Sequence, residues 1–225
     1  MHEYAEIKGY RELENGTELK VFVPKDIKEY LKKYQKGGKV ESELRLDDPR
    51  YISSRQRNAI YATVNDISDW YGEVPEYLKE LLKAYYMIEQ DRKYFSLSNC
   101  SVTEARMFID YLLEFALKHD VALSERGLER TDNIDRYLWM CLKHRKCAIC
   151  GTKADLHHAL EDKIGMGNNR NKVNHIGRKA VALCRRHHTE LHSMSEMDFY
   201  NKHRIHPIKL DDALAESLGL NRKGE

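Results

Sequence analysis

Long apolar runs are missing from this sequence, which excludes a membrane-spanning helix of about 20 consecutive apolar residues. The opening stretch, MHEYAEIKGY, also lacks the apolar core of a secretory signal peptide. No internal repeat or low-complexity stretch is found. The chain of 225 residues is long enough for one large domain or two small ones. We therefore expect a globular protein of the cytoplasm.

A strong charge of either sign is also missing, because 38 Lys and Arg oppose 36 Asp and Glu, a net charge of +2. The distribution is uneven. Residues 141–225 contain 16 basic and 10 acidic side chains (+6), which leaves 22 basic and 26 acidic ones (−4) for residues 1–140. The basic C-terminal segment suits a polyanionic partner, although a solvated surface has the same composition.

Cysteine is scarce, with five residues, and three of them cluster with histidines: Cys147, Cys150 and Cys184. In a chain without a secretion signal, this clustering favours metal binding over disulfides. Cys100 and Cys141 lie instead in apolar helical patterns, which is typical of buried thiols. Nine of the 11 histidines fall within residues 144–206.

Short-range patterns predict an α+β fold. Two strands, Tyr4–Ile7 and Glu18–Val23, flank an Asn-Gly turn signal, and a third strand is expected at Val40–Leu46. Helical periodicity and capping residues predict the helices Ile27–Tyr34, Ser53–Gly72, Pro75–Gln90, Ser101–His119, Thr131–His144, Ser195–Arg204 and Leu210–Leu218. We expect an α+β domain over residues 1–145, with a small antiparallel sheet and several helices. A metal-rich domain then covers residues 146–225.

Two pairs of soft ligands share one spacing: Cys147 with Cys150, and Cys184 with His187. A pair separated by two residues wraps a single Zn²⁺, because the tight turn directs both ligand atoms inward. Together the pairs predict a closed, tetrahedral structural zinc site. The alternative is a chance pair of cysteines, and the second pair argues against it.

Four further histidines alternate with these ligands: His157, His158, His188 and His192. His188 and His192 lie four residues apart, so on a helix both face one side and can hold one ion. His157 and His158 are adjacent, so in a strand they point to opposite sides. One can then bind metal while the other accepts a proton. For any single histidine the alternative is a surface or hydrogen-bonded role.

The run CAIC…LHHAL…VALCRRHHTELH resembles the HNH, or ββα-metal, nucleases, and most closely those encoded by phages of Gram-positive hosts. The resemblance covers residues 146–192 and implies a zinc-stabilised ββα-metal domain. It assigns His158 as general base and His157, His188 and His192 as ligands of the catalytic metal. The four zinc ligands match the knuckles that many members add.

The implied reaction is metal-dependent hydrolysis of DNA phosphodiester bonds. Mg²⁺ or Mn²⁺ is the expected catalytic ion, and three imidazoles would also hold Ni²⁺ or Zn²⁺. The candidates for phosphate contacts are Arg170, Arg178, Lys179, Arg185 and Arg186, with a solvated basic face as the alternative.

One position departs from the family pattern. Lys179 stands where the family carries an Asn that orients the catalytic loop. The candidates for the same task are Asn168, Asn169, Asn171, Asn174 and His175.

The segment ISSRQRNAIYATVNDIS, residues 52–68, resembles the helix of phage Orf (NinB-type) recombination proteins, and SVTEARMFIDYLLEFA is similar to a later helix of that family. The resemblance implies a homodimer that binds single-stranded DNA and cooperates with single-strand binding protein and a recombinase. Arg50, Arg55 and Arg57 would contact DNA. The alternative is that they cap and solvate this helix, and the −4 balance weighs against a broad nucleic-acid surface.

The leading hypothesis is thus a phage-encoded endonuclease of DNA recombination or processing, acting on single-stranded or branched DNA. The alternative is a non-enzymatic recombination mediator whose HNH fold is a structural zinc and DNA-binding module. Lys179 favours the mediator, whereas the four histidines favour the enzyme. A zinc-finger transcription factor fits less well, because 33 residues separate the two ligand pairs and no recognition-helix pattern lies between them.

Overall fold

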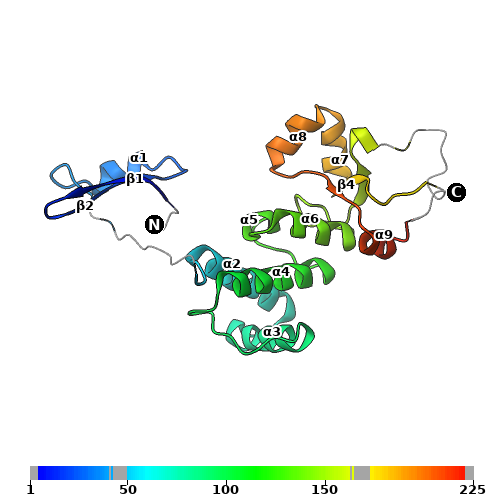
Figure 1. The fold of residues 1–225 in the computed structure, drawn as a ribbon, viewed down its shortest axis with the longest axis horizontal. Helices are drawn as coiled ribbons and strands as arrows, with labels where there is room; N and C mark the ends of the chain where they lie inside the picture. Colours follow the sequence, from blue (N-terminus) through cyan, green and yellow to red (C-terminus); the bar gives the residue numbers. More distant parts are fainter. Residues whose placement is uncertain (1–4, 41, 43–49, 163, 165–172, 221–225) are drawn as a thin grey trace. The chain divides into compact units, whose positions relative to one another are not determined.

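A computed structural model describes residues 5–40, 42, 50–162, 164 and 173–220 (Figure 1). The chain divides into two compact units, Met1–Leu46 and Asp47–Glu225. The predicted boundary between residues 145 and 146 differs from this division by compactness. As a boundary between two functional domains it stays a prediction.

The first unit contains an antiparallel hairpin of β1 (Glu6–Leu13) and β2 (Gly16–Phe22), followed by α1 (Lys28–Tyr34). The predicted hairpin and helix are confirmed. The first strand extends six residues beyond its predicted end, because its polar half also pairs, as in the Arg11–Glu18 ion pair of 2.6 Å. Most of the expected strand at residues 40–46 lies outside the described residues.

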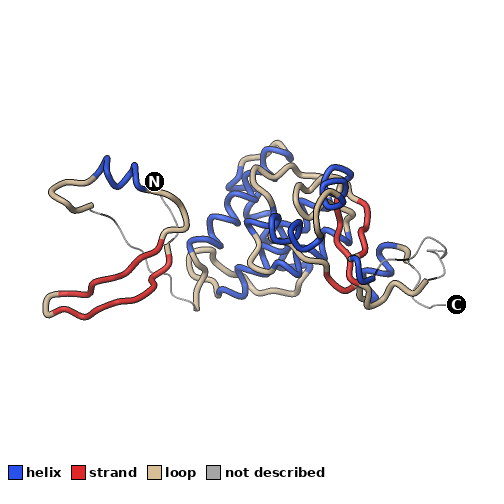
Figure 2. Tube along the Cα trace, turned by 90° about the horizontal axis from the view of Figure 1, so that it is seen from above, coloured by secondary structure: helices blue, strands red, loops and turns tan. Residues whose placement is uncertain are grey.

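Mixed α+β architecture is confirmed for the second unit, which Figure 2 shows as helices with a small sheet. Its helices are α2 (Ser54–Tyr71), α3 (Pro75–Glu89), α4 (Val102–Lys118), α5 (Gly127–Arg130), α6 (Ile134–Lys143), α7 (Arg185–His192), α8 (Glu196–His203) and α9 (Asp212–Leu218). Its sheet has the order β3 (Asp155–His158), β4 (Lys179–Leu183), β5 (Ile208–Lys209), all antiparallel.

Local capping determines where the long helices begin and end. The Ser53 side chain accepts a hydrogen bond from the Gln56 N–H, and the Gln56 side chain accepts one from the Ser53 N–H. Gly72 ends α2 in the left-handed conformation. Ser101 caps α4 by accepting from the Glu104 N–H, as predicted, and the Glu104 carboxylate accepts from Tyr86. The short helix α5 lies between the predicted helices Ser101–His119 and Thr131–His144, where no element was predicted.

Helix α6 joins the helical half of this unit, which contains α2 to α4, to the half that contains the sheet. It packs against α4 on one side and against β4, β5 and α9 on the other. Its buried side chains, such as Tyr137 and Met140, belong to a continuous apolar core that runs from Ile52 to Leu218. The sheet and α7 are thereby held on a rigid helical base.

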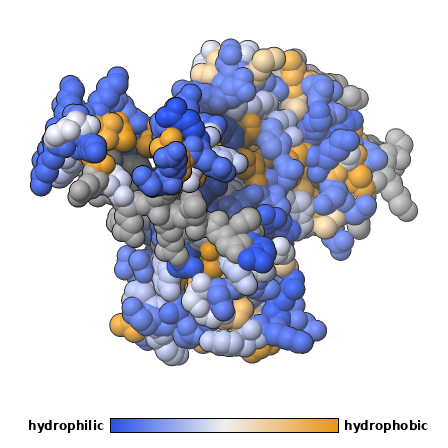
Figure 3. All heavy atoms as spheres, turned by 60° about the vertical axis from the view of Figure 1, so that its left-hand side comes forward, coloured by the Kyte–Doolittle hydropathy of each residue, from blue (hydrophilic) through white to orange (hydrophobic). Residues whose placement is uncertain are grey.

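Hydrophilic side chains dominate the face shown in Figure 3, with small apolar areas between them. Within the described residues, no helix is both long enough and apolar enough to cross a membrane.

Candidate metal centres of the ββα element

Strands β3 and β4 and helix α7 form a ββα element. The strands pair so that His157 lies opposite Val181 and His158 opposite Ala180. Strand β4 has four buried residues in succession and ends at Leu183. Cys184 then caps α7, so the chain turns directly from sheet to helix at a candidate ligand.

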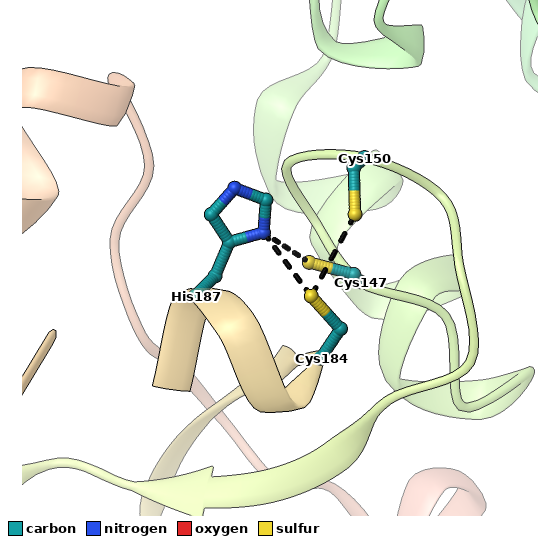
Figure 4. A group of neighbouring side chains, drawn as sticks. All are labelled: Cys147, Cys150, Cys184 and His187. Atoms are coloured by element: carbon teal, nitrogen blue, oxygen red, sulfur yellow. Dashed lines mark hydrogen bonds between the residues drawn. The ribbon is translucent and has the colours of Figure 1, made fainter. Parts of the chain in front are cut away.

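The predicted zinc ligands converge at the start of α7 (Figure 4). Cys147 and Cys150 come from a tight turn in which Gly151 adopts a positive φ of 70° and its N–H donates to the Cys147 carbonyl. Cys184 and His187 come from the first turn of the helix. The four ligand atoms all lie within 4.8 Å of one another.

The distances between these atoms fit a tetrahedral zinc ion. The Sγ atoms of Cys150 and Cys184 are 3.7 Å apart, and His187 Nδ1 lies 3.3 Å from the Sγ atoms of both Cys147 and Cys184. Zn–S bonds of about 2.3 Å and a Zn–N bond of about 2.0 Å require S···S and S···N edges of roughly 3.7 and 3.5 Å. The cluster can therefore hold a metal ion such as zinc.

The electrostatics of the thiols also bear on metal binding. Burial raises the pKa of Cys147 to about 12. Burial also acts to raise the pKa of Cys184, but hydrogen bonds, first that of the His187 backbone, outweigh it and hold the pKa below its ordinary value. The Arg186 guanidinium lies 3.1 Å from His187 Nε2. With a metal ion at Nδ1 the ring proton lies on Nε2, so this exposed guanidinium must turn away from the ring.

The second cluster consists of His157, His188 and His192, whose ligand atoms also lie within 4.8 Å of one another. His157 Nδ1 is 2.9 Å from His188 Nε2, and the rings of His188 and His192 are 4.7 Å apart. One ligand thus comes from β3 and two from successive turns of α7. This is the arrangement that the four-residue spacing predicted.

Burial favours the neutral form of two histidines of this cluster, His157 and His188. It lowers the pKa of His157, helped by the proximity of His188, and it lowers the pKa of His188, helped by His192. Neutral imidazoles present the lone pairs that a divalent ion requires.

His158 contacts a different set of groups from those of His157, as expected for neighbours in a strand. Its Nε2 lies 3.2 Å from Nδ1 of His175, which is 3% exposed. Of the two candidates for the missing Asn that the structure describes, Asn174 and His175, it is His175 that contacts the predicted base. The Asn174 side chain instead accepts from the Ile176 N–H. Asn168, Asn169 and Asn171 lie outside the described residues.

Asp162 accepts hydrogen bonds from Lys179, the position at which the sequence departs from the family pattern, and from its neighbour Arg178. Its carboxylate accepts from the Lys179 N–H at 2.8 Å, and its carbonyl accepts from Arg178 at 3.0 Å. The Lys179 ammonium pairs with Glu161 at 2.5 Å. Nothing in the sequence pattern distinguished Asp162, because its partners lie 16 and 17 residues further along the chain.

The predicted DNA contacts differ in how the structure uses them. Arg55 donates to the carbonyls of Glu129 and Thr131, and Arg57 to those of Leu97 and Ser98, so both support packing of the helical half. The guanidinium of Arg50 lies over the Tyr51 ring. Arg185 and Arg186 are exposed on α7, and Arg170 lies outside the described residues. Phosphate binding by any of them stays a prediction.

One neighbour of the histidine cluster was not anticipated from the sequence. Glu196, the first residue of α8, places its Oε1 atom 3.6 Å from His157 Nε2. The only local signal is an acidic residue after the helix cap Ser195, and that is common at helix starts.

Comparison with known proteins agrees with this geometry. A family described as "Putative HNHc nuclease" matches residues 27–221, most of the chain and both sides of the predicted boundary at residue 145. No curated protein and no solved structure matches. Because the match covers most of the chain, including both pairs of soft ligands and His157, His158, His188 and His192, the chain belongs to the family described as "Putative HNHc nuclease".

Proposed function

We propose that the chain is a metal-dependent endonuclease that hydrolyses DNA phosphodiester bonds at the ββα element. The observation that carries the proposal is the convergence of His157, His188 and His192, with all ligand atoms within 4.8 Å. A purely structural zinc domain has no use for a second cluster of three imidazoles. Membership of the nuclease family supports the same reading.

His158 is the proposed general base. It takes a proton from a water molecule whose oxygen then bonds to phosphorus, while the bond from phosphorus to the 3′ oxygen breaks. The contact with buried His175 fixes the orientation of the His158 ring, as proton transfer requires. A divalent ion at the three-histidine cluster would polarise the phosphate and stabilise the charge that develops on the departing oxygen.

The donor set bears on the identity of the ion. Imidazole nitrogens suit Zn²⁺, Ni²⁺ and other transition ions, whereas Mg²⁺ prefers oxygen ligands. We propose that Mn²⁺ and Ni²⁺ support cleavage better than Mg²⁺. The Cys₃His cluster holds zinc and serves stability alone.

The proposal extends to the biological substrate. We propose single-stranded or branched DNA of phage recombination, with residues 1–145 as the targeting domain. Support comes from the resemblance of residues 52–68 and 101–116 to Orf proteins and from the basic charge of residues 141–225. The accompanying homodimer is testable by sedimentation, and the preference for single strands by competition binding.

The decisive experiment is a cleavage assay on single-stranded, duplex and branched DNA with Mg²⁺, Mn²⁺ and Ni²⁺. His158→Ala should reduce the rate by about 10²- to 10⁴-fold. His206→Ala is the matched control, because His206 is exposed and pairs with Asp135 away from the cluster. Binding of DNA without cutting in any metal would instead support the non-enzymatic recombination mediator.

A further inference from the structure

Two buried atoms beside the histidine cluster face each other without a partner. His157 Nε2 and Glu196 Oε1 are both inaccessible to solvent, and neither makes a hydrogen bond within the described part of the chain. They lie 3.6 Å apart. A buried polar group without a partner costs about 1–3 kcal/mol, so the pairing calls for a physical reason.

The rest of the Glu196 side chain is held in place. Its other oxygen, Oε2, accepts a hydrogen bond from the Leu160 N–H at 3.0 Å, and the side chain is 19% exposed. Leu160 follows strand β3, which carries His157. Glu196 therefore connects the end of this strand to the start of α8, and its free oxygen is directed at the imidazole.

The position of the ring proton of His157 decides what this contact does. His157 Nδ1 faces the other cluster members, 2.9 Å from His188 Nε2. A cation bound there takes the lone pair of Nδ1, so the ring proton must lie on Nε2. That proton points at Glu196 Oε1, and the two unpartnered atoms become donor and acceptor. Histidine ligands in metal sites commonly donate their second N–H to a carboxylate in this way.

We propose that Glu196 is a positioning residue of the metal centre, whose carboxylate accepts the Nε2–H of His157 and fixes the tautomer that leaves Nδ1 for a divalent cation. The inference rests on the proposed function of the three-histidine cluster. Glu196 also adds a negative charge next to a ligand set that has none of its own. That charge increases the affinity for a divalent ion over that of three imidazoles alone.

A structural role for Glu196 is separable from this one. Glu196→Gln keeps the length of the side chain and an oxygen that can accept from Leu160 or from His157, but it removes the charge. Glu196→Ala removes both acceptors. Glu161→Gln is a matched control, because Glu161 is a nearby exposed carboxylate that pairs with Lys179.

The test measures Ni²⁺ binding to the full, zinc-loaded chain by titration calorimetry, together with the ¹⁵N shifts of His157 in the absence of Ni²⁺. We expect Glu196→Gln to weaken binding about 10-fold and Glu196→Ala by up to about 100-fold, with Glu161→Gln unchanged. Zinc content and the thermal midpoint of Glu196→Gln should equal those of the wild type. The ¹⁵N shifts should report the Nε2–H tautomer in the wild type and a mixture in Glu196→Ala.

The outcomes separate this inference from the proposed function. Wild-type Ni²⁺ affinity and tautomer populations in both Glu196 variants would overturn the inference and leave the nuclease proposal intact. A wild-type chain that binds zinc but no Ni²⁺ would overturn both. If Glu196→Ala does not fold, the comparison between Glu196→Gln and Glu161→Gln decides.

Discussion

The two candidate ligand clusters of the ββα element are built from different donors. The first has four candidate ligands, three of them thiols, and the three distances of 3.3, 3.3 and 3.7 Å between its atoms are close to the edges of a tetrahedron around zinc. The second has three ligands, all imidazoles. Four protein ligands close the coordination of zinc, whereas three leave a position for water or substrate. The difference in ligand number therefore supports the proposal of a structural site at the first cluster and a catalytic site at the second.

The surroundings of the two clusters also differ. The thiol cluster lies where the Cys147 turn meets β4 through the hydrogen bond from the Ala148 N–H to the Ala182 carbonyl. The imidazole cluster has a carboxylate, Glu196, on one side and the neighbouring His158 on the strand that supplies its first ligand. Stability should depend on the first cluster and turnover on the second.

The largest expected effect follows from removing a thiol. Cys184→Ala should abolish zinc binding and lower the free energy of unfolding by more than about 4 kcal/mol, because the ββα element loses the ion that joins its turn to its helix. Chemical denaturation and zinc analysis measure both changes. Cys100→Ala, at a buried thiol of the helical half, should retain a full equivalent of zinc. Retention of zinc by Cys184→Ala would contradict the assignment of the thiol cluster as the zinc site.

Removing an imidazole should lower the cleavage rate and leave zinc content and stability unchanged. His188→Ala should keep one zinc per chain and a wild-type unfolding curve, but lose the second, exchangeable ion. Loss of several kcal/mol of transition-state stabilisation corresponds to at least about a 100-fold lower cleavage rate. Metal analysis and a cleavage assay, with His206→Ala as control, test this. A full cleavage rate would show that the cluster is not the catalytic centre.

The two clusters should differ in the number of protons that they release on binding metal. The reason is that the pKa of Cys147 is raised, whereas the pKa values of His157 and His188 are lowered. Burial raises the pKa of Cys147 to about 12, so this thiol is protonated at pH 7 and must lose its proton to zinc. The pKa values of His157 and His188 are lowered, so both are already neutral at pH 7. Calorimetry in buffers of different ionisation enthalpy should detect more protons released by zinc than by Ni²⁺. Equal release would contradict the assignment.

The smallest effect concerns a charge remote from both clusters. Hydrogen bonds, first that with His144 and then that with Lys143, lower the pKa of the Glu114 carboxylate to about 2 against the opposing effect of burial. A lowered folded-state pKa stabilises the fold above the ordinary value near 4.5, and this contribution is lost as pH falls towards 2. Glu114→Gln should therefore cost about 1–2 kcal/mol at pH 7 after allowance for solvent screening, and almost nothing near pH 2. Both metal contents should stay unchanged.

Local sequence signals were sufficient for much of the fold and both ligand sets. Ser53, Gly72 and Ser101 predicted helix ends because capping involves residues only a few positions apart. The spacing of Cys184 with His187 and of His188 with His192 predicted which side chains lie close together, because one turn of helix fixes their geometry.

Contacts between residues far apart in the sequence could not be predicted from those local signals. Glu196 meets His157 from 39 residues away, and His175 meets His158 from 17 residues away, so neither partner follows from periodicity. The four-residue helix α5 has too few turns to show a period. The polar half of β1 was not recognised as a strand because its stabilising pairs lie on β2.

Helix α7 supplies ligands to both clusters, with His187 and His188 as neighbours assigned to different ions. Maturation of the protein should therefore follow an order. If zinc at Cys184 and His187 fixes helix α7 against the strands, it also sets the position of His188 and His192 relative to His157 on β3. On the proposed function, a newly made chain without zinc should therefore not cleave DNA, and zinc binding should precede binding of the catalytic ion.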